Sequence, residues 1–225
     1  MANFRTHIVG GAVLGTAVGA TAFAFGLVSS RPLLSLGLAG VVAAGSVAPD
    51  IDSDTSVPFH VTFGILSLAA GAATLVRVLE LFPGDWLRLI LWPMAVAVFF
   101  WTAVGWVFKK FTRHRGMVHS IPSALLSGLL LFLLAGRLGA AEWSSFLLAL
   151  SIFLGYLLHL ILDELYAAVN FNGLKFEPKR SFGSALKFYS GSRRACLAVY
   201  TALAVIILTQ QGRLAGLVQR LLDYA

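Results

Sequence analysis

The sequence is poor in cysteine and in charge. Its 225 residues include a single cysteine, Cys196, which excludes an intramolecular disulfide and a cysteine-rich zinc site. Charged residues make up 12% of the chain and hydrophobic residues 58%, whereas soluble domains carry roughly twice that share of charge. A soluble fold of this size would need more polar surface to cover its core. The composition therefore predicts that the lipid bilayer surrounds most of the chain.

The sequence also lacks common signatures of soluble enzymes. No Ser-His-Asp triad, phosphate-binding glycine loop or dinucleotide fingerprint can be recognised in it. The pair Gly10 and Gly11 indicates close helix packing and not nucleotide binding, because no strand precedes it.

Long apolar runs are abundant instead. A membrane-spanning helix needs about 20 residues, so we predict an all-α transmembrane bundle of about six to seven membrane stretches. We expect it to form a single membrane-embedded domain over residues 1–225. The second and the last stretch are short enough to be tilted, re-entrant or interfacial. The stretches are 8–28, 33–48, 59–82, 86–108, 121–138, 144–169 and 195–208.

Positive charge is distributed unevenly between the predicted loops. The net charge is +7, and if every stretch spans the bilayer, most lysines and arginines share the side of the N-terminus. That side holds the loops 49–58, 109–120 and 170–194. Because cytoplasmic loops carry an excess of Lys and Arg, we expect this side to face the cytoplasm of a bacterial inner membrane. Basic residues arranged in this way determine topology and do not predict a nucleic-acid partner.

Histidines and aspartates gather on the same predicted side. The predicted topology rests on Lys and Arg alone, so this agreement favours one shared site at the cytoplasmic face. The candidate metal ligands are His7, Asp50, Asp52, His114, His119, His159 and Asp163.

His159 and Asp163 are the most informative of these residues. At positions i and i+4 they share one face of a helix, and ionisable groups inside a membrane stretch are costly and usually functional. Two ligands at this spacing can hold one metal ion. The alternative interpretation is a hydrogen-bonded His–Asp pair that joins two helices.

The other candidates lie near loops. Gly116 permits a bend that turns His114 and His119 toward one point, although a basic loop contacting lipid phosphates is the alternative. Asp50 and Asp52 offer hard oxygen ligands, and the alternative is a solvated acidic loop. His7, near the start of the first stretch, is a weak candidate when considered alone.

Mixed imidazole and carboxylate ligands favour zinc, with manganese or iron next. A mononuclear catalytic zinc uses three protein ligands and a water molecule. Because seven candidates are too many for one such site, we expect one or two divalent ions.

Four motifs occur in order along the chain: Thr6-His7, Pro49-Asp50-Ile51-Asp52, His114-Arg115-Gly116 with His119-Ser120, and His159 with Asp163. This pattern resembles the YdjM-like inner-membrane proteins, a family of membrane-bound metal-dependent hydrolases, and is more distantly similar to zinc-dependent phospholipase C. The resemblance covers most of the chain and implies a helical membrane bundle, a hydrolase and the same ligands.

We expect a hydrolase that uses metal-activated water on a phosphoester or ester bond of a lipid-like substrate. The general base is expected to be Asp52 or Glu164. The aromatic and basic loop 170–194 has the composition of an interfacial segment on anionic lipid. A structural metal site without catalysis, or a metal-ion or proton transporter, is the alternative. Cations expected to bind the substrate phosphate are Arg113, Arg115, Lys109 and Lys110.

Overall fold

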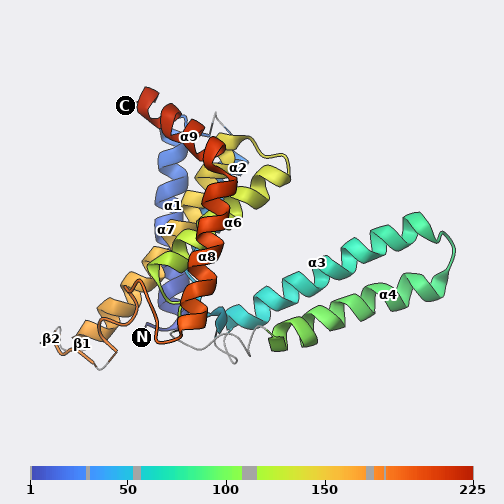
Figure 1. Ribbon diagram of the computed structural model, residues 1–225, viewed down its shortest axis with the longest axis horizontal. Coiled ribbons are helices and arrows are strands. Elements are labelled where there is room, and N and C mark those ends of the chain that lie inside the picture. Colours follow the sequence, from blue (N-terminus) through green and yellow to red (C-terminus); the bar gives the residue numbers. More distant parts are fainter. Residues whose placement is uncertain are drawn as a thin grey trace. The chain divides into compact units, whose positions relative to one another are not determined.

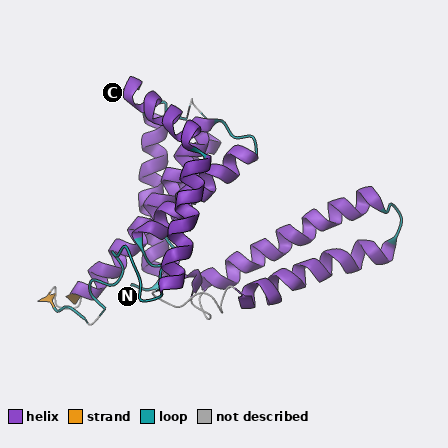
Figure 2. Ribbon diagram, in the orientation of Figure 1, coloured by secondary structure: helices purple, strands orange, loops and turns teal. Residues whose placement is uncertain are grey.

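The computed structural model describes residues 2–28, 31–52, 57–107, 116–170, 175–179 and 181–224. Contacts between residues divide the chain into two compact units. The first unit comprises residues 1–49 and 115–225, and the second comprises residues 50–114. Both are built from helices (Figure 2). The prediction of a single domain over residues 1–225 is not tested by this division.

The first unit contains six α-helices among its described residues, and the longest of them, α7, packs most closely against three of the others. Figure 1 shows these helices grouped along α7. They are α1 (Phe4–Ala24), α2 (Pro32–Gly45), α6 (Ile121–Arg137), α7 (Glu142–Ala168), α8 (Arg193–Thr209) and α9 (Gln211–Tyr224).

Glycines allow α1, α2 and α7 to approach one another closely. A Cβ atom on Gly15 of α1 would collide with the backbone of Ala39 in α2, and one on Gly155 of α7 would collide with the backbone of Val42. Helix pairs in membranes use small residues in this way to increase van der Waals contact. Because α1 and α7 both pack on α2, their polar residues are brought to one place.

The end of α7 leads into a long connection to α8. Val169–Asn170 (β1) pairs antiparallel with Lys175–Phe176 (β2), and this pair is the only sheet among the described residues. The chain then returns along α7, where the backbone N–H groups of Glu177 and Lys179 donate to the carbonyls of Ala168 and Ala167. These bonds satisfy carbonyl groups that the end of a helix otherwise leaves without partners.

The second unit is a helical hairpin of α3 (Val57–Leu81) and α4 (Trp86–Phe99). A five-residue π-helical turn, Phe100–Val104 (η2), continues α4. None of the residues of α4 is buried, and apart from Arg88 in its first turn the helix is apolar. A helix that exposes apolar residues on every face suits a lipid environment.

The all-α membrane bundle predicted from the sequence is confirmed. Four helices are long and apolar enough to cross a membrane, and α8 with α9 is a fifth candidate, bent by 71° at their junction. The helices α2 and α6, with 14 and 17 residues, are shorter than the usual span. All seven predicted apolar stretches contain a helix, and among the α-helices that the structure describes, α9 alone was not predicted.

Candidate metal centre

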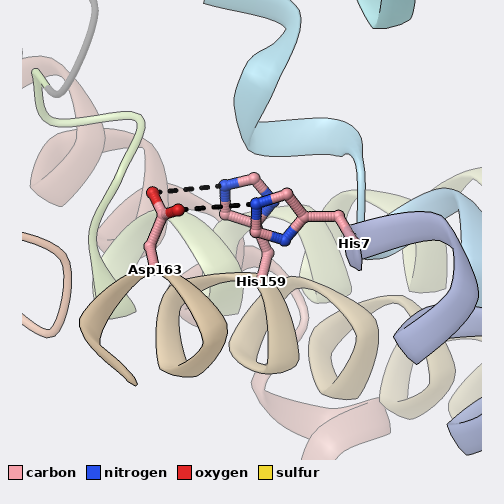
Figure 3. Close-up of side chains that lie close together, drawn as sticks. All are labelled: His7, His159 and Asp163. Atoms are coloured by element: carbon pink, nitrogen blue, oxygen red, sulfur yellow. Dashed lines mark ion pairs between the residues drawn. The ribbon is translucent and has the colours of Figure 1, made fainter. Parts of the chain in front are cut away.

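Three ionisable side chains meet where α1 crosses α7, and we call His7, His159 and Asp163 the cluster (Figure 3). Nε2 of His7 lies 3.4 Å from Oδ1 of Asp163, and Nε2 of His159 lies 3.9 Å from Oδ2. The two imidazole rings are stacked, with their centroids 3.8 Å apart and their planes 15° apart. Each carboxylate oxygen therefore faces a different histidine.

The cluster is shielded from solvent. His7 and His159 are 0% exposed and Asp163 is 1% exposed. Burial of ionisable groups is costly unless they are paired or bind a metal. Yet Nδ1 and Nε2 of His7 and Oδ2 of Asp163 make no hydrogen bond to any residue that the structure describes.

The spacing of the cluster fits a metal ion. One donor atom from each of the three residues lies within 4.8 Å of the others. Nitrogen and oxygen donors bound tetrahedrally at about 2.0–2.2 Å would lie roughly 3.3–3.6 Å apart. The His–Asp distances are close to that value, and a bound cation would satisfy the buried atoms that have no hydrogen-bond partner.

Ser46, at the C-terminus of α2, is hydrogen-bonded to the ring of His159 and to the backbone of His7. Its carbonyl oxygen lies 2.8 Å from Nδ1 of His159, and its hydroxyl donates to the carbonyl of His7 at 2.9 Å. When Nδ1 of His159 donates to Ser46, Nε2 carries a lone pair toward Asp163. This arrangement is the usual one for a metal-binding histidine, whose second nitrogen is held by a backbone carbonyl.

Asp163 is fixed from a second direction. The backbone N–H of Ala2, just before α1, donates to Oδ1 of Asp163 at 3.2 Å. Hydrogen bonds to a coordinating carboxylate fix its direction.

His119 lies beside the cluster. Its ring is 0% exposed, and its centroid is 5.4 Å from that of His159. The segment that carries it is irregular, as expected from Gly116. The segment is held by the hydroxyl of Tyr156, which donates to the carbonyl of Val118 at 2.6 Å.

The remaining predicted metal ligands lie in the second unit or outside the described residues. Asp50 and Asp52 belong to a short 3-10 helix, Ala48–Asp52 (η1), and lie at the start of the second unit. Their role as metal ligands stays a prediction, and so does the role of Asp52 as a general base. Outside the described residues lie His114, Arg113, Arg115, Lys109 and Lys110.

Glu164 has a different environment from its neighbour Asp163. Its carboxylate accepts hydrogen bonds from the backbone N–H groups of Gly183 at 2.7 Å, Ala185 at 2.5 Å and Leu186 at 3.3 Å. All three donors belong to one segment of the chain, so the carboxylate of Glu164 ties that segment to α7. The geometry gives Glu164 an anchoring role, and its role as general base stays a prediction.

The segment that Glu164 anchors, residues 181–190, is here called the strap. The strap carbonyl of Lys187 accepts from the backbone N–H of Ile121 at the start of α6 at 3.0 Å, and that of Phe188 accepts from the hydroxyl of Tyr200 in α8 at 2.7 Å. The strap thus joins α6, α7 and α8 next to the segment that carries His119.

Sequence reasoning missed Ser46, Ala2 and the anchoring role of Glu164. Ser46 stands in an Ala-Gly-Ser-Val run, where a small polar residue is common in membrane helices. Ala2 acts through its backbone, which residue type does not reveal. For Glu164, its position directly after Asp163 was the only signal, and it suggested a shared role that the structure does not show.

Long apolar helices that enclose two histidines and an aspartate define this chain as a polytopic membrane protein with a candidate metal centre. A family model described as YdjM inner membrane protein matches residues 1–219, and the chain belongs to that family. No curated protein and no solved structure matches the chain. The resemblance to YdjM-like proteins is thus confirmed, whereas the more distant similarity to zinc-dependent phospholipase C stays a prediction.

Proposed function

We propose that this protein is a membrane-bound metal-dependent hydrolase whose metal is held by His7, His159 and Asp163. The observation that supports this most directly is the arrangement of the cluster, in which each oxygen of one buried carboxylate faces a different imidazole nitrogen. Two imidazoles and one carboxylate are the three-ligand set of several catalytic zinc sites, which leave a fourth position open.

The metal class follows from the donors. Two nitrogens and one oxygen favour zinc first, with manganese or iron as the next candidates. His119 is positioned to take part as a further ligand or to orient His159. A second ion would draw on Asp50, Asp52 and His114, which the sequence pattern predicts as ligands.

A bound divalent ion would supply hydrolytic chemistry by activating water near neutral pH. The chain's own residues would do the rest. His7, His159 and Asp163 fix the site, and Ser46 holds the ring of His159 and the backbone carbonyl of His7. Because the carboxylate of Glu164 is engaged by the strap, we favour Asp52 over Glu164 as the general base.

A lipid-like phosphoester or ester is the substrate class we propose. The strap and the β2 strand expose large aromatic side chains, among them Phe176, Phe182, Phe188 and Tyr189. Aromatic side chains near lysines are typical of the membrane interface. Arg113, Arg115 and Lys109 would neutralise a substrate phosphate. The positive-inside bias supports a cytoplasmic location for this end.

A structural metal is the second candidate function, and the burial of the cluster favours it. A catalytic site has to admit its substrate, whereas a structural site is closed. In that case the ion would join α1 to α7. Its removal would unfold the first unit, and the metal-loaded protein would have no catalytic activity.

Elemental analysis of the protein purified in mild detergent without chelators tests the proposal. We expect about one or two equivalents of a divalent metal per chain. The double variant His159→Ala, Asp163→Ala should lose one equivalent, while His60→Ala, which changes an exposed histidine of the second unit, should retain it. Failure of the wild type to hold any metal, even after reloading, would contradict both candidate functions.

Turnover then separates the two candidates. Release of a headgroup or fatty acid from phospholipid vesicles by the metal-loaded protein, lost in the double variant, supports the hydrolase. Stoichiometric metal with no turnover on phospholipids or simple phosphoesters, together with unfolding on chelation, supports the structural site.

A further inference from the structure

A groove of about 590 Å³ lies at the opposite end of the first unit from the cluster. It is bounded by the start of α2 and by the turn that joins α6 to α7. Ser144 in its wall precedes His159 by 15 residues of α7, which places the groove about 22 Å from the cluster along the helix axis. The two features are therefore separate.

The walls of the groove are mostly apolar. Leu33 and Leu34 of α2 face Ala140, Ser144 and Leu148 across it. Its volume falls within the range of about 300–1,000 Å³ that is usual for small-molecule sites. Such a groove suits a hydrocarbon chain.

Its mouth carries a positive charge. Arg31 is the only charged residue among the described residues that line the groove, and it forms no ion pair with any residue that the structure describes. Glu142, close by in sequence at the start of α7, is engaged by Arg213 at 3.7 Å and by Arg220 at 3.6 Å. The charge of Arg31 is thus left for an external anion.

The depth of the groove matches the membrane interface. α7 is 27 residues long and begins at Glu142, so the groove lies at the end of a span. Nε1 of Trp143 donates to the carbonyl of Leu27 at 2.9 Å, and tryptophan is enriched at headgroup depth. An apolar groove at this depth with a cation at its mouth is complementary to a phospholipid, whose phosphate is anionic and whose acyl chains are apolar.

We propose that this groove binds one anionic phospholipid, with the phosphate beside Arg31 and an acyl chain along Leu33, Leu34 and Leu148. The site is independent of the proposed hydrolase activity. The helices α2 and α7 both begin without a side-chain cap, so their N-terminal dipoles add to the attraction for negative charge.

The test is lipid retention by the full chain, measured by native mass spectrometry in neutral detergent. The probes are phosphatidylglycerol and phosphatidylcholine with identical acyl chains. Arg31→Gln removes the charge at the groove. Arg137→Gln is the matched control, because Arg137 is exposed in the last turn of α6 and does not line the groove.

We expect the wild type to retain one phosphatidylglycerol in preference to phosphatidylcholine. Arg31→Gln should weaken this retention about tenfold, as expected for loss of one charge-assisted contact, while Arg137→Gln should leave it within twofold of the wild type. Equal retention of both lipids by the wild type, or equal losses in both arginine variants, would overturn the proposal.

A second variant probes the apolar part of the groove. Ser144→Leu fills space between α2 and α7 without a change in charge, and it should reduce the retention of both lipids. If Ser144→Leu retains lipid as the wild type does while its thermal unfolding is unchanged, no acyl chain occupies the groove.

Discussion

Asp163 and Glu164 are neighbours in the sequence, yet their carboxylates bind different partners. Oδ1 of Asp163 lies 3.4 Å from Nε2 of His7, whereas the carboxylate of Glu164 accepts hydrogen bonds from three backbone N–H groups of the strap. Successive residues of a helix point about 100° apart, so one turn of α7 can serve the cluster and the strap together. The cluster and the strap are therefore mechanically linked through α7.

Replacement of Glu164 tests this division of roles. Glu164→Ala leaves three backbone donors without their acceptor, and we expect the free energy of unfolding to fall by about 3 kcal/mol. Glu164→Gln keeps an acceptor oxygen and should cost about half as much. Thermal unfolding measures both effects, and the metal content should stay unchanged.

The outcome for activity separates an anchor from a general base. If the protein turns over phospholipid, Glu164→Gln should retain most of its activity. A loss of turnover in a Glu164→Gln variant that keeps its stability and metal would show that Glu164 transfers a proton after all.

Replacement of Asp163 removes the only carboxylate of the cluster. Asp163→Asn preserves the shape of the side chain but not its charge, so we expect the affinity for zinc to fall by at least ~100-fold, more than the 10–100-fold typical of residues that only orient ligands. Competition with a fluorescent chelator measures the affinity. Asp85→Asn, at the exposed N-cap of α4, is the matched control and should bind zinc as the wild type does.

The helical architecture follows from the sequence because the bilayer demands long apolar runs. The same logic finds His159 and Asp163, since one helix fixes their spacing. A search for long apolar runs does not find α9, because an amphipathic helix is apolar on one side only. It also leaves His7 ambiguous, because its place beside α7 depends on tertiary packing at Gly15 and Gly155.

The contacts of Ser46 and Glu164 are beyond sequence reasoning for a related reason. Each bonds to backbone groups of segments distant in sequence, Ser46 to His7 and Glu164 to the strap. A backbone carbonyl or N–H is present at nearly every position, so residue types cannot identify which one is used.

Close helix packing should be needed for the cluster as well as for stability. Gly155→Ala places a methyl group against the backbone carbonyl of Val42, so α7 has to move away from α2. Overpacking of this kind costs about 1–3 kcal/mol, and it should also weaken zinc binding. Gly37→Ala is the control, since nothing lies within 4 Å of a Cβ atom there, and it should be neutral or stabilising in thermal unfolding. Equal effects of the two substitutions would contradict the packing argument.

Metal removal should destabilise the protein through the cluster alone. A ligand that binds only the folded state adds about 4 kcal/mol at a free concentration of 1,000 times its Kd, so zinc should raise the Tm of the chelator-treated wild type. His7→Ala removes a proposed metal ligand whose two ring nitrogens have no hydrogen-bond partner among the described residues. The Tm of this variant should respond little to zinc. His60→Ala, in the second unit, should respond as the wild type does. If zinc raises the Tm of His7→Ala by as much as that of the wild type, His7 is not a ligand, and its contact with Asp163 is then an ion pair that joins α1 to α7.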